Sequence, residues 1–127
     1  MKKIVSTNKA PSAIGPYNQG TSLDNLVFTS GQIALVPETM ELVEGGIVEQ
    51  SKQVMENLKA VLEEAGSSYE NVLKTTCYLS DMDNFATFNE VYSEYFKAET
   101  APARSTVAVK TLPKNVLVEV DAIAYKN

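Results

Sequence analysis

The sequence predicts an α+β fold in which two helices cover one face of a mixed sheet of about six strands. Two segments repeat apolar residues at helical spacing. Six others are short and rich in β-branched and aromatic residues, and turns containing Gly, Pro, Asn or Asp separate them. Because two helices can cover only one face of a sheet this wide, the expected architecture is a two-layer sandwich with one bare sheet face.

The N-terminal third contributes a short strand and a hairpin. Ile4 and Val5 predict the short strand, and the Ser-, Asn- and Pro-rich segment after it predicts a loop as far as Pro16. Residues 17–23 and 26–34 flank Asp24-Asn25, a two-residue polar turn that suits a hairpin. Gly31 interrupts the second run, and a glycine inside a strand marks a bulge or a close approach to the backbone.

The middle third predicts two amphipathic helices with a strand between them. The first helix begins at Ile47 and Gly66 caps its C-terminus, after which residues 72–79 form a strand. Asp81 and Asp83 can cap the second helix, which ends before Pro102. Its apolar residues, spaced three or four apart, are Phe85, Phe88, Val91, Tyr92, Tyr95 and Phe96.

The last third predicts two strands, over 103–110 and 116–125, separated by a turn at 112–115. Alternate residues of the final strand, from Val116 to Ala124, are Val or Ala and can pack on the helices. The other set combines apolar residues with two carboxylates: Leu117, Glu119, Asp121, Ile123 and Tyr125. This composition predicts a homo-oligomer formed through the bare face; the alternative is a monomer with a semi-apolar solvated face.

Composition excludes several classes of site. The 127 residues, expected to form one domain over 1–127, include no His, one Cys and one Arg. A Ser-His-Asp triad, a Cys-His dyad, a zinc knuckle and an intrachain disulfide are therefore impossible, and no metal site is expected. The six glycines form no phosphate-binding loop, so neither NAD, FAD nor ATP is expected as a cofactor.

Charge and hydropathy indicate the compartment and the partners. The net charge of -5 disfavours binding to nucleic acid. No stretch of about 18 apolar residues is present, and no apolar segment of a signal peptide follows Lys2-Lys3. We therefore expect a cytoplasmic protein that does not bind membranes.

Arg104 is the first candidate site residue, because the chain uses lysine for its other ten basic side chains. A guanidinium binds a planar carboxylate through two parallel hydrogen bonds, which an ammonium group does not. The alternative is an ordinary salt bridge to a neighbouring glutamate.

Glu119 is the second candidate, since it lies within the apolar run VLVEVDAIA. A buried acid needs a partner or has a raised pKa, and both conditions suit acid–base chemistry; the alternative is a solvated carboxylate beside Asp121.

Tyr17 follows Gly15-Pro16 and is a weaker candidate, because most such tyrosines are interfacial aromatics. Cys77 is expected to be a small buried apolar residue.

Five segments together resemble the reactive intermediate deaminase (RidA, also YjgF) family: AIGPYNQG (13–20), FTSGQIALVP (28–37), QSKQVMENLKAVLEEAG (50–66), KTTCYLSDMDNFATFNEVYSEYF (74–96) and APARSTVAVKTLPKNVLVEVDAIA (101–124). The resemblance covers nearly the whole chain. It implies a chorismate-mutase-like α+β fold and a homotrimer with sites between subunits. It also implies cofactor-independent hydrolysis of 2-imino acids, such as 2-iminobutanoate and 2-iminopropanoate, to 2-oxo acids and ammonia.

The resemblance also assigns roles to residues. Arg104 matches the arginine that holds the substrate carboxylate, Glu119 the glutamate associated with the attacking water, and Tyr17 the pocket tyrosine. The remaining substrate-binding positions are the backbone turn at Ser30 and Gly31, the helix position Asn89, and Thr106. At position 106 many members have Cys, so a thiol is not required here, although a backbone contact would survive.

Two other functions remain open at this point. Arg104 could hold a small carboxylate in a non-catalytic, regulatory trimer. Family members have also been described as translation inhibitors or ribonucleases, a role against which the acidic charge and the lack of His weigh.

Overall fold

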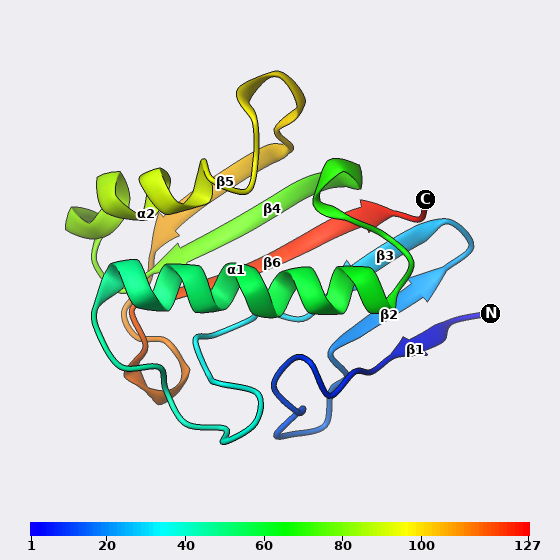
Figure 1. The fold of residues 1–127 in the computed structure, drawn as a ribbon, viewed down its shortest axis with the longest axis horizontal. Helices are drawn as coiled ribbons and strands as arrows, with labels where there is room; N and C mark the ends of the chain where they lie inside the picture. Colours follow the sequence, from blue (N-terminus) through cyan, green and yellow to red (C-terminus); the bar gives the residue numbers. More distant parts are fainter.

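A computed structural model describes all 127 residues and confirms the predicted fold class, with both helices on one face of a six-stranded sheet (Figure 1). The strand order is β1-β2-β3-β6-β4-β5, and every neighbouring pair is antiparallel except β4 and β5. The strands are β1 (Lys3–Val5), β2 (Gly20–Leu23), β3 (Leu26–Thr29), β4 (Val72–Leu79), β5 (Ala103–Ala108) and β6 (Val118–Tyr125).

The predicted hairpin is present, but both of its strands are shorter than expected. Strand β2 begins at Gly20 rather than at residue 17, because the buried Gln19 side chain donates hydrogen bonds to the carbonyls of Thr7, Ala10 and Pro11 and so joins the N-terminal loop. Strand β3 ends at Thr29 rather than at residue 34. The chain leaves the sheet at Gly31 and returns for a single bridge between Gln32 and Val120.

Helix α1 (Ile47–Glu64) is followed, as predicted, by Gly66 at its C-terminus, and the φ of Gly66, 83°, lies in the left-handed region. The N–H groups of Gly66 and Ser67 donate to the carbonyls of Glu63 and Leu62, which satisfies the last turn. The buried stripe of the helix consists of Val54, Met55, Leu58, Val61 and Leu62. This stripe packs on the sheet and forms the centre of the core.

Helix α2 (Phe85–Tyr92) is shorter than the expected 85–96, because the chain continues past Ser93 in turns. Phe96 nevertheless packs in the core, as its spacing predicted. Four short 3-10 helices complete the chain: η1 (Tyr69–Asn71), η2 (Met82–Asn84), η3 (Ala98–Thr100) and η4 (Pro113–Asn115). Asp81 caps η2 by accepting the Asp83 N–H at 2.8 Å.

The last two strands are also shorter than expected, since β5 ends at Ala108 and β6 begins at Val118. The alternation along β6 is confirmed, because its Val and Ala residues are buried under the helices while Glu119, Asp121 and Ile123 are only partly buried. Neither helix is both long and apolar enough to cross a membrane.

The opposite face of the sheet is uncovered in the single chain (Figure 1). Strand pairing places Leu26 beside Tyr125 and Phe28 beside Ile123 on this face. The side chains of Leu26, Phe28 and Tyr125 are each about 40% exposed. We call this surface the open face; it is more apolar than a solvated sheet needs to be.

Candidate functional site

Helix α2 holds the Arg104 side chain in place. Arg104 lies on the edge strand β5 in register with Thr75, which is fully buried, so the arginine points to the helix side of the sheet. Its Nη1 donates a hydrogen bond to Asn89 Oδ1 at 2.7 Å. Its guanidinium carbon lies 4.7 Å from the Tyr92 ring centroid and 5.5 Å from that of Phe85. Both contacts are favourable cation–π distances.

The sequence spacing of α2 explains this arrangement. Phe85, Asn89 and Tyr92 are separated by four and three residues, so they lie on one face of the helix. The Tyr92 hydroxyl is itself fixed by a 2.8 Å hydrogen bond with the Thr75 hydroxyl. The group that holds Arg104 is a neutral amide, which leaves its positive charge and its other N–H donors available for an anion.

Glu119 lies on the other side of the sheet. It is opposite Tyr78 in the pairing of β6 with β4, and its side chain projects from the open face. Burial, with a smaller contribution from the charge of Asp121, raises the pKa of Glu119 above its ordinary value. Burial likewise raises the pKa of Asp121, whose Oδ2 accepts a 3.4 Å hydrogen bond from the Tyr78 hydroxyl.

Gly31 and Tyr17 lie in the neighbourhood of Glu119. A β-carbon on Gly31 would fall 2.1 Å from Glu119 Oε2, so the carboxylate rests against the glycine backbone. Tyr17 and Gly31 line one small hollow of about 30 Å³. The Tyr17 hydroxyl accepts the Ile14 N–H at 3.3 Å, and the Ser30 hydroxyl donates to the Asn18 carbonyl, so the loop carrying Tyr17 is tied to the turn at Ser30.

Thr106 and Cys77 are register partners on β5 and β4. The Thr106 Oγ1 atom is buried and has no hydrogen-bond partner. Cys77 is fully buried, as predicted, and burial raises the pKa of its thiol to about 11, so the thiol stays neutral near pH 7. The hydroxyl of Thr106 is therefore not presented to solvent in the single chain.

The predicted residues thus form two separate groups within one chain. Arg104 and Asn89 lie on the helix side. Glu119 projects from the open face with Gly31 against it, and Tyr17 lines a hollow with Gly31. Arg104 is two strands and three residues away from Glu119, which is about 14 Å between Cα atoms at ordinary strand spacings. Because their side chains also point to opposite faces, one small substrate cannot contact both from the same chain.

Two residues of the Arg104 group, Phe85 and Tyr92, were expected only as core aromatics. Their spacing with Asn89 was visible in the sequence, but the register that puts Arg104 beneath them was not. No group of three or more His, Cys, Asp or Glu side chains is gathered as a metal site.

A family model described as endoribonuclease L-PSP matches residues 7–126, which is nearly the whole chain. The chain belongs to this family, the RidA (YjgF) family that its motifs resemble.

Several relatives match over nearly the whole of this chain. A RutC family protein of Pyrococcus abyssi is 55% identical over 98% of both chains. The 2-iminobutanoate/2-iminopropanoate deaminase of mouse is 46% identical, over 99% of this chain and 93% of its own. A solved structure of a Thermotoga maritima protein has a TM-score of 0.96 and 53% identity, over 100% of this chain and 99% of its own.

Proposed function

We propose that this RidA family protein hydrolyses 2-imino acids, such as 2-iminobutanoate and 2-iminopropanoate, to 2-oxo acids and ammonia. The observation that carries the proposal is the setting of Arg104, whose guanidinium is held by the neutral Asn89 amide and the Tyr92 ring. Such a guanidinium is oriented but not neutralised, which suits a planar carboxylate. The 46% sequence identity with a mouse enzyme named for this reaction supports the same proposal.

We further propose that the active site forms between copies of the chain in a homotrimer. Arg104 of one copy would face Glu119, Gly31 and Tyr17 of its neighbour, because these groups cannot meet within one chain. The apolar open face supports this assembly, since covering Leu26, Phe28 and Tyr125 removes exposed apolar surface from water.

The proposed chemistry begins with the iminium form of the substrate, whose carboxylate binds Arg104. A water molecule attacks C2 while the Glu119 carboxylate accepts a proton from it, and the π electrons of the C=N bond move to nitrogen. Glu119 then returns this proton to the nitrogen of the carbinolamine. The C–N bond breaks as the oxygen lone pair forms C=O, the hydroxyl proton passes to Glu119, and ammonia leaves.

The raised pKa of Glu119 suits both steps, because a carboxylate of higher pKa is a stronger base toward the attacking water, and its acid form keeps the proton until it is returned to nitrogen. Gly31 lets the Glu119 carboxylate approach the backbone turn at Ser30, which we propose as a wall of the site together with Tyr17 and the Thr106 backbone. Imines also hydrolyse unaided. The protein therefore needs to lower the barrier by only a few kcal/mol, below the roughly 8 to 23 kcal/mol typical of enzymes.

The test is accelerated loss of 2-iminobutanoate, generated in place by a threonine dehydratase, with ammonia and 2-oxobutanoate as measured products. Arg104→Lys keeps the charge but loses the fork geometry. We expect kcat/KM to fall roughly 30- to 1000-fold, which corresponds to about 2 to 4 kcal/mol. Absence of acceleration by the parent, or cleavage of RNA in a parallel assay that Arg104→Lys abolishes, would refute the proposal.

A further inference from the structure

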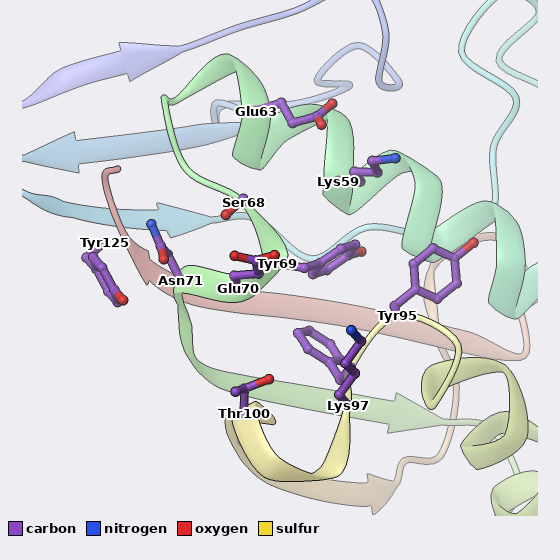
Figure 2. Close-up of a pocket in the computed structure, with 11 residues that line it drawn as sticks. Lys59, Glu63, Ser68, Tyr69, Glu70, Asn71, Tyr95, Lys97, Thr100 and Tyr125 are labelled. Atoms are coloured by element: carbon purple, nitrogen blue, oxygen red, sulfur yellow. The ribbon is translucent and has the colours of Figure 1, made fainter.

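One cavity of the chain lies away from both residue groups of the candidate site. It has a volume of about 590 Å³ and lies between the C-terminal half of α1, the segment of η1, and the segment from Tyr95 to Thr100 (Figure 2). This volume is within the range of small-molecule sites, which is about 300 to 1,000 Å³. Neither Arg104 nor Glu119 lines it.

The inner wall of this cavity is a rigid aromatic cluster. The Tyr69 ring meets Phe96 edge-on at 4.8 Å and Tyr95 at 5.6 Å. Each tyrosine hydroxyl makes a hydrogen bond within the chain: Tyr69 donates to the Met55 carbonyl, and Tyr95 donates to Glu56 Oε2 at 2.9 Å. The two tyrosine rings are therefore fixed in place. Both are partly exposed, whereas Phe96 is buried, so Tyr69 and Tyr95 present the apolar surface to which a flat ligand can bind without reorganisation.

Charged groups of both signs surround this aromatic wall. Lys59 from α1 and Lys97 from the segment after α2 lie on either side of the Tyr69 ring in Figure 2. Glu63 and Glu70 also line the cavity, so its charged side chains balance. A ligand that carries one positive and one negative charge can pair with a glutamate and with a lysine of this cavity. A simple anion pairs only with the lysines, and a simple cation pairs only with the glutamates.

The rest of the molecule narrows the ligand class further. The net charge of -5 disfavours a multiply charged anion such as a nucleotide. The single arginine, which is the side chain best suited to phosphate, is in the other site. What remains is a ligand with a flat aromatic body, a carboxylate and an ammonium group.

We propose that this cavity is a second binding site, which takes an aromatic α-amino acid. The ring of the ligand packs against Tyr69 and Tyr95, its carboxylate contacts Lys59 or Lys97, and its ammonium group contacts Glu63 or Glu70. This site is distinct from the one proposed for imino acids.

The chain offers a direct test, because it contains no tryptophan, so all indole fluorescence in the sample comes from the added ligand and a change in that fluorescence reports binding. Titration of the full chain, followed by indole fluorescence and by calorimetry, should show saturable binding of one L-tryptophan per chain. Indole, which lacks both charges, and glycine, which lacks the ring, should each bind at least about tenfold more weakly. No saturation at about 10 mM L-tryptophan would overturn the proposal.

Substitutions then locate the ligand. Lys59→Gln combined with Lys97→Gln should weaken L-tryptophan binding about tenfold or more, whereas Lys52→Gln should not change it. Lys52 is a matched control because it is exposed on the same helix and does not line the cavity. Equal binding by the Lys59/Lys97 variant and the parent contradicts the proposal.

One more comparison separates this cavity from the imino-acid site. Phe96 packs on Tyr92, which lies under Arg104, so aromatic substitutions would disturb both regions, and the test avoids them. L-tryptophan should bind Arg104→Lys as it binds the parent, and 2-oxobutanoate should not displace it. Displacement, or loss of binding in Arg104→Lys, means that L-tryptophan occupies the imino-acid site and overturns the proposal.

Discussion

Gly31 lies against the carboxylate of Glu119 so closely that no other residue fits at position 31 without moving it. A β-carbon there would be 2.1 Å from Glu119 Oε2 and 2.7 Å from Cδ. The backbone of Gly31 has no positive φ, so the requirement for glycine is one of space rather than of conformation. The departure of the chain from the sheet after β3 and the position of Glu119 on β6 are therefore linked through Gly31.

Gly31→Ala should push the Glu119 carboxylate away from the backbone turn. A displacement of this size costs on the order of 100-fold in activity when it moves a reacting group, so we expect a loss of that order in kcat/KM for 2-iminobutanoate. The control is Gly46→Ala, because a β-carbon at Gly46 meets nothing within 4 Å. Full activity of Gly31→Ala with an unchanged oligomeric state would show that the position of Glu119 does not matter for turnover.

Glu119→Gln should separate stability from activity. Burial raises the pKa of Glu119 in the folded chain above its pKa in the unfolded chain. At a pH above the raised pKa, the ionised carboxylate therefore lowers the free energy of unfolding. This destabilisation disappears when the pH falls below the pKa of Glu119 in the unfolded chain. We expect Glu119→Gln to unfold at a higher temperature than the parent at pH 7, with the difference shrinking as pH falls toward 4, while deamination is lost.

Thermal unfolding of parent and variant across this pH range is the measurement for Glu119→Gln. Glu44→Gln is the matched control, because Glu44 is an exposed loop residue and its substitution should move neither stability nor activity. A Glu119→Gln variant less stable than the parent at pH 7 would mean that the carboxylate has a stabilising partner.

The sequence predicted the two layers of the fold, but it did not predict on which side of the sheet each site residue lies. The alternation along β6 and the apolar stripe of α1 are local patterns, and local patterns decide which side of an element is buried. The parallel pairing of β4 with β5 is a contact between distant segments that no local pattern encodes. That pairing sends Arg104 under α2, to the opposite side of the sheet from Glu119. For the same reason no local pattern predicted that Asn89 contacts Arg104, or that Gln19 holds the N-terminal loop.

Asn89→Asp should weaken the binding of carboxylates although it changes only one atom group. Asn89 Oδ1 accepts a hydrogen bond from Arg104 Nη1 at 2.7 Å, so a carboxylate there would pair with the guanidinium and compete with the ligand for its charge. We expect the affinity for 2-oxobutanoate to fall about tenfold or more, and calorimetry measures it.

Two comparisons support the interpretation of Asn89→Asp. Asn89→Ala removes the acceptor without adding charge, so it should weaken binding less than Asn89→Asp does. Glu90→Gln, at the next position of the same helix, is a control for a change of charge that points elsewhere. If Asn89→Asp binds 2-oxobutanoate as tightly as the parent does, Arg104 is not the carboxylate-binding group.

If the protein forms the proposed homotrimer, mixed assemblies of two inactive variants should recover activity. If Arg104 and Glu119 meet only across an interface, a site that takes Arg104 from a Glu119→Gln chain and Glu119 from an Arg104→Lys chain has both groups intact. When equal amounts of the two variants are refolded together, each position in the assembly is filled by either variant at random. About a quarter of the interfaces then combine the intact Arg104 with the intact Glu119, so activity should be near a quarter of the parent value. Each variant refolded alone should stay inactive.

The double variant Arg104→Lys/Glu119→Gln, refolded with an equal amount of parent chain, provides the matched control. A site built across the interface needs two parent chains side by side, so about a quarter of sites are active, as in the first mixture. A site contained in one chain predicts about half activity in this control and none in the mixture of single variants. The two arrangements therefore give opposite patterns from the same pair of measurements. Because the strand register already sends Arg104 and Glu119 to opposite faces of the sheet, we expect the pattern of the shared site.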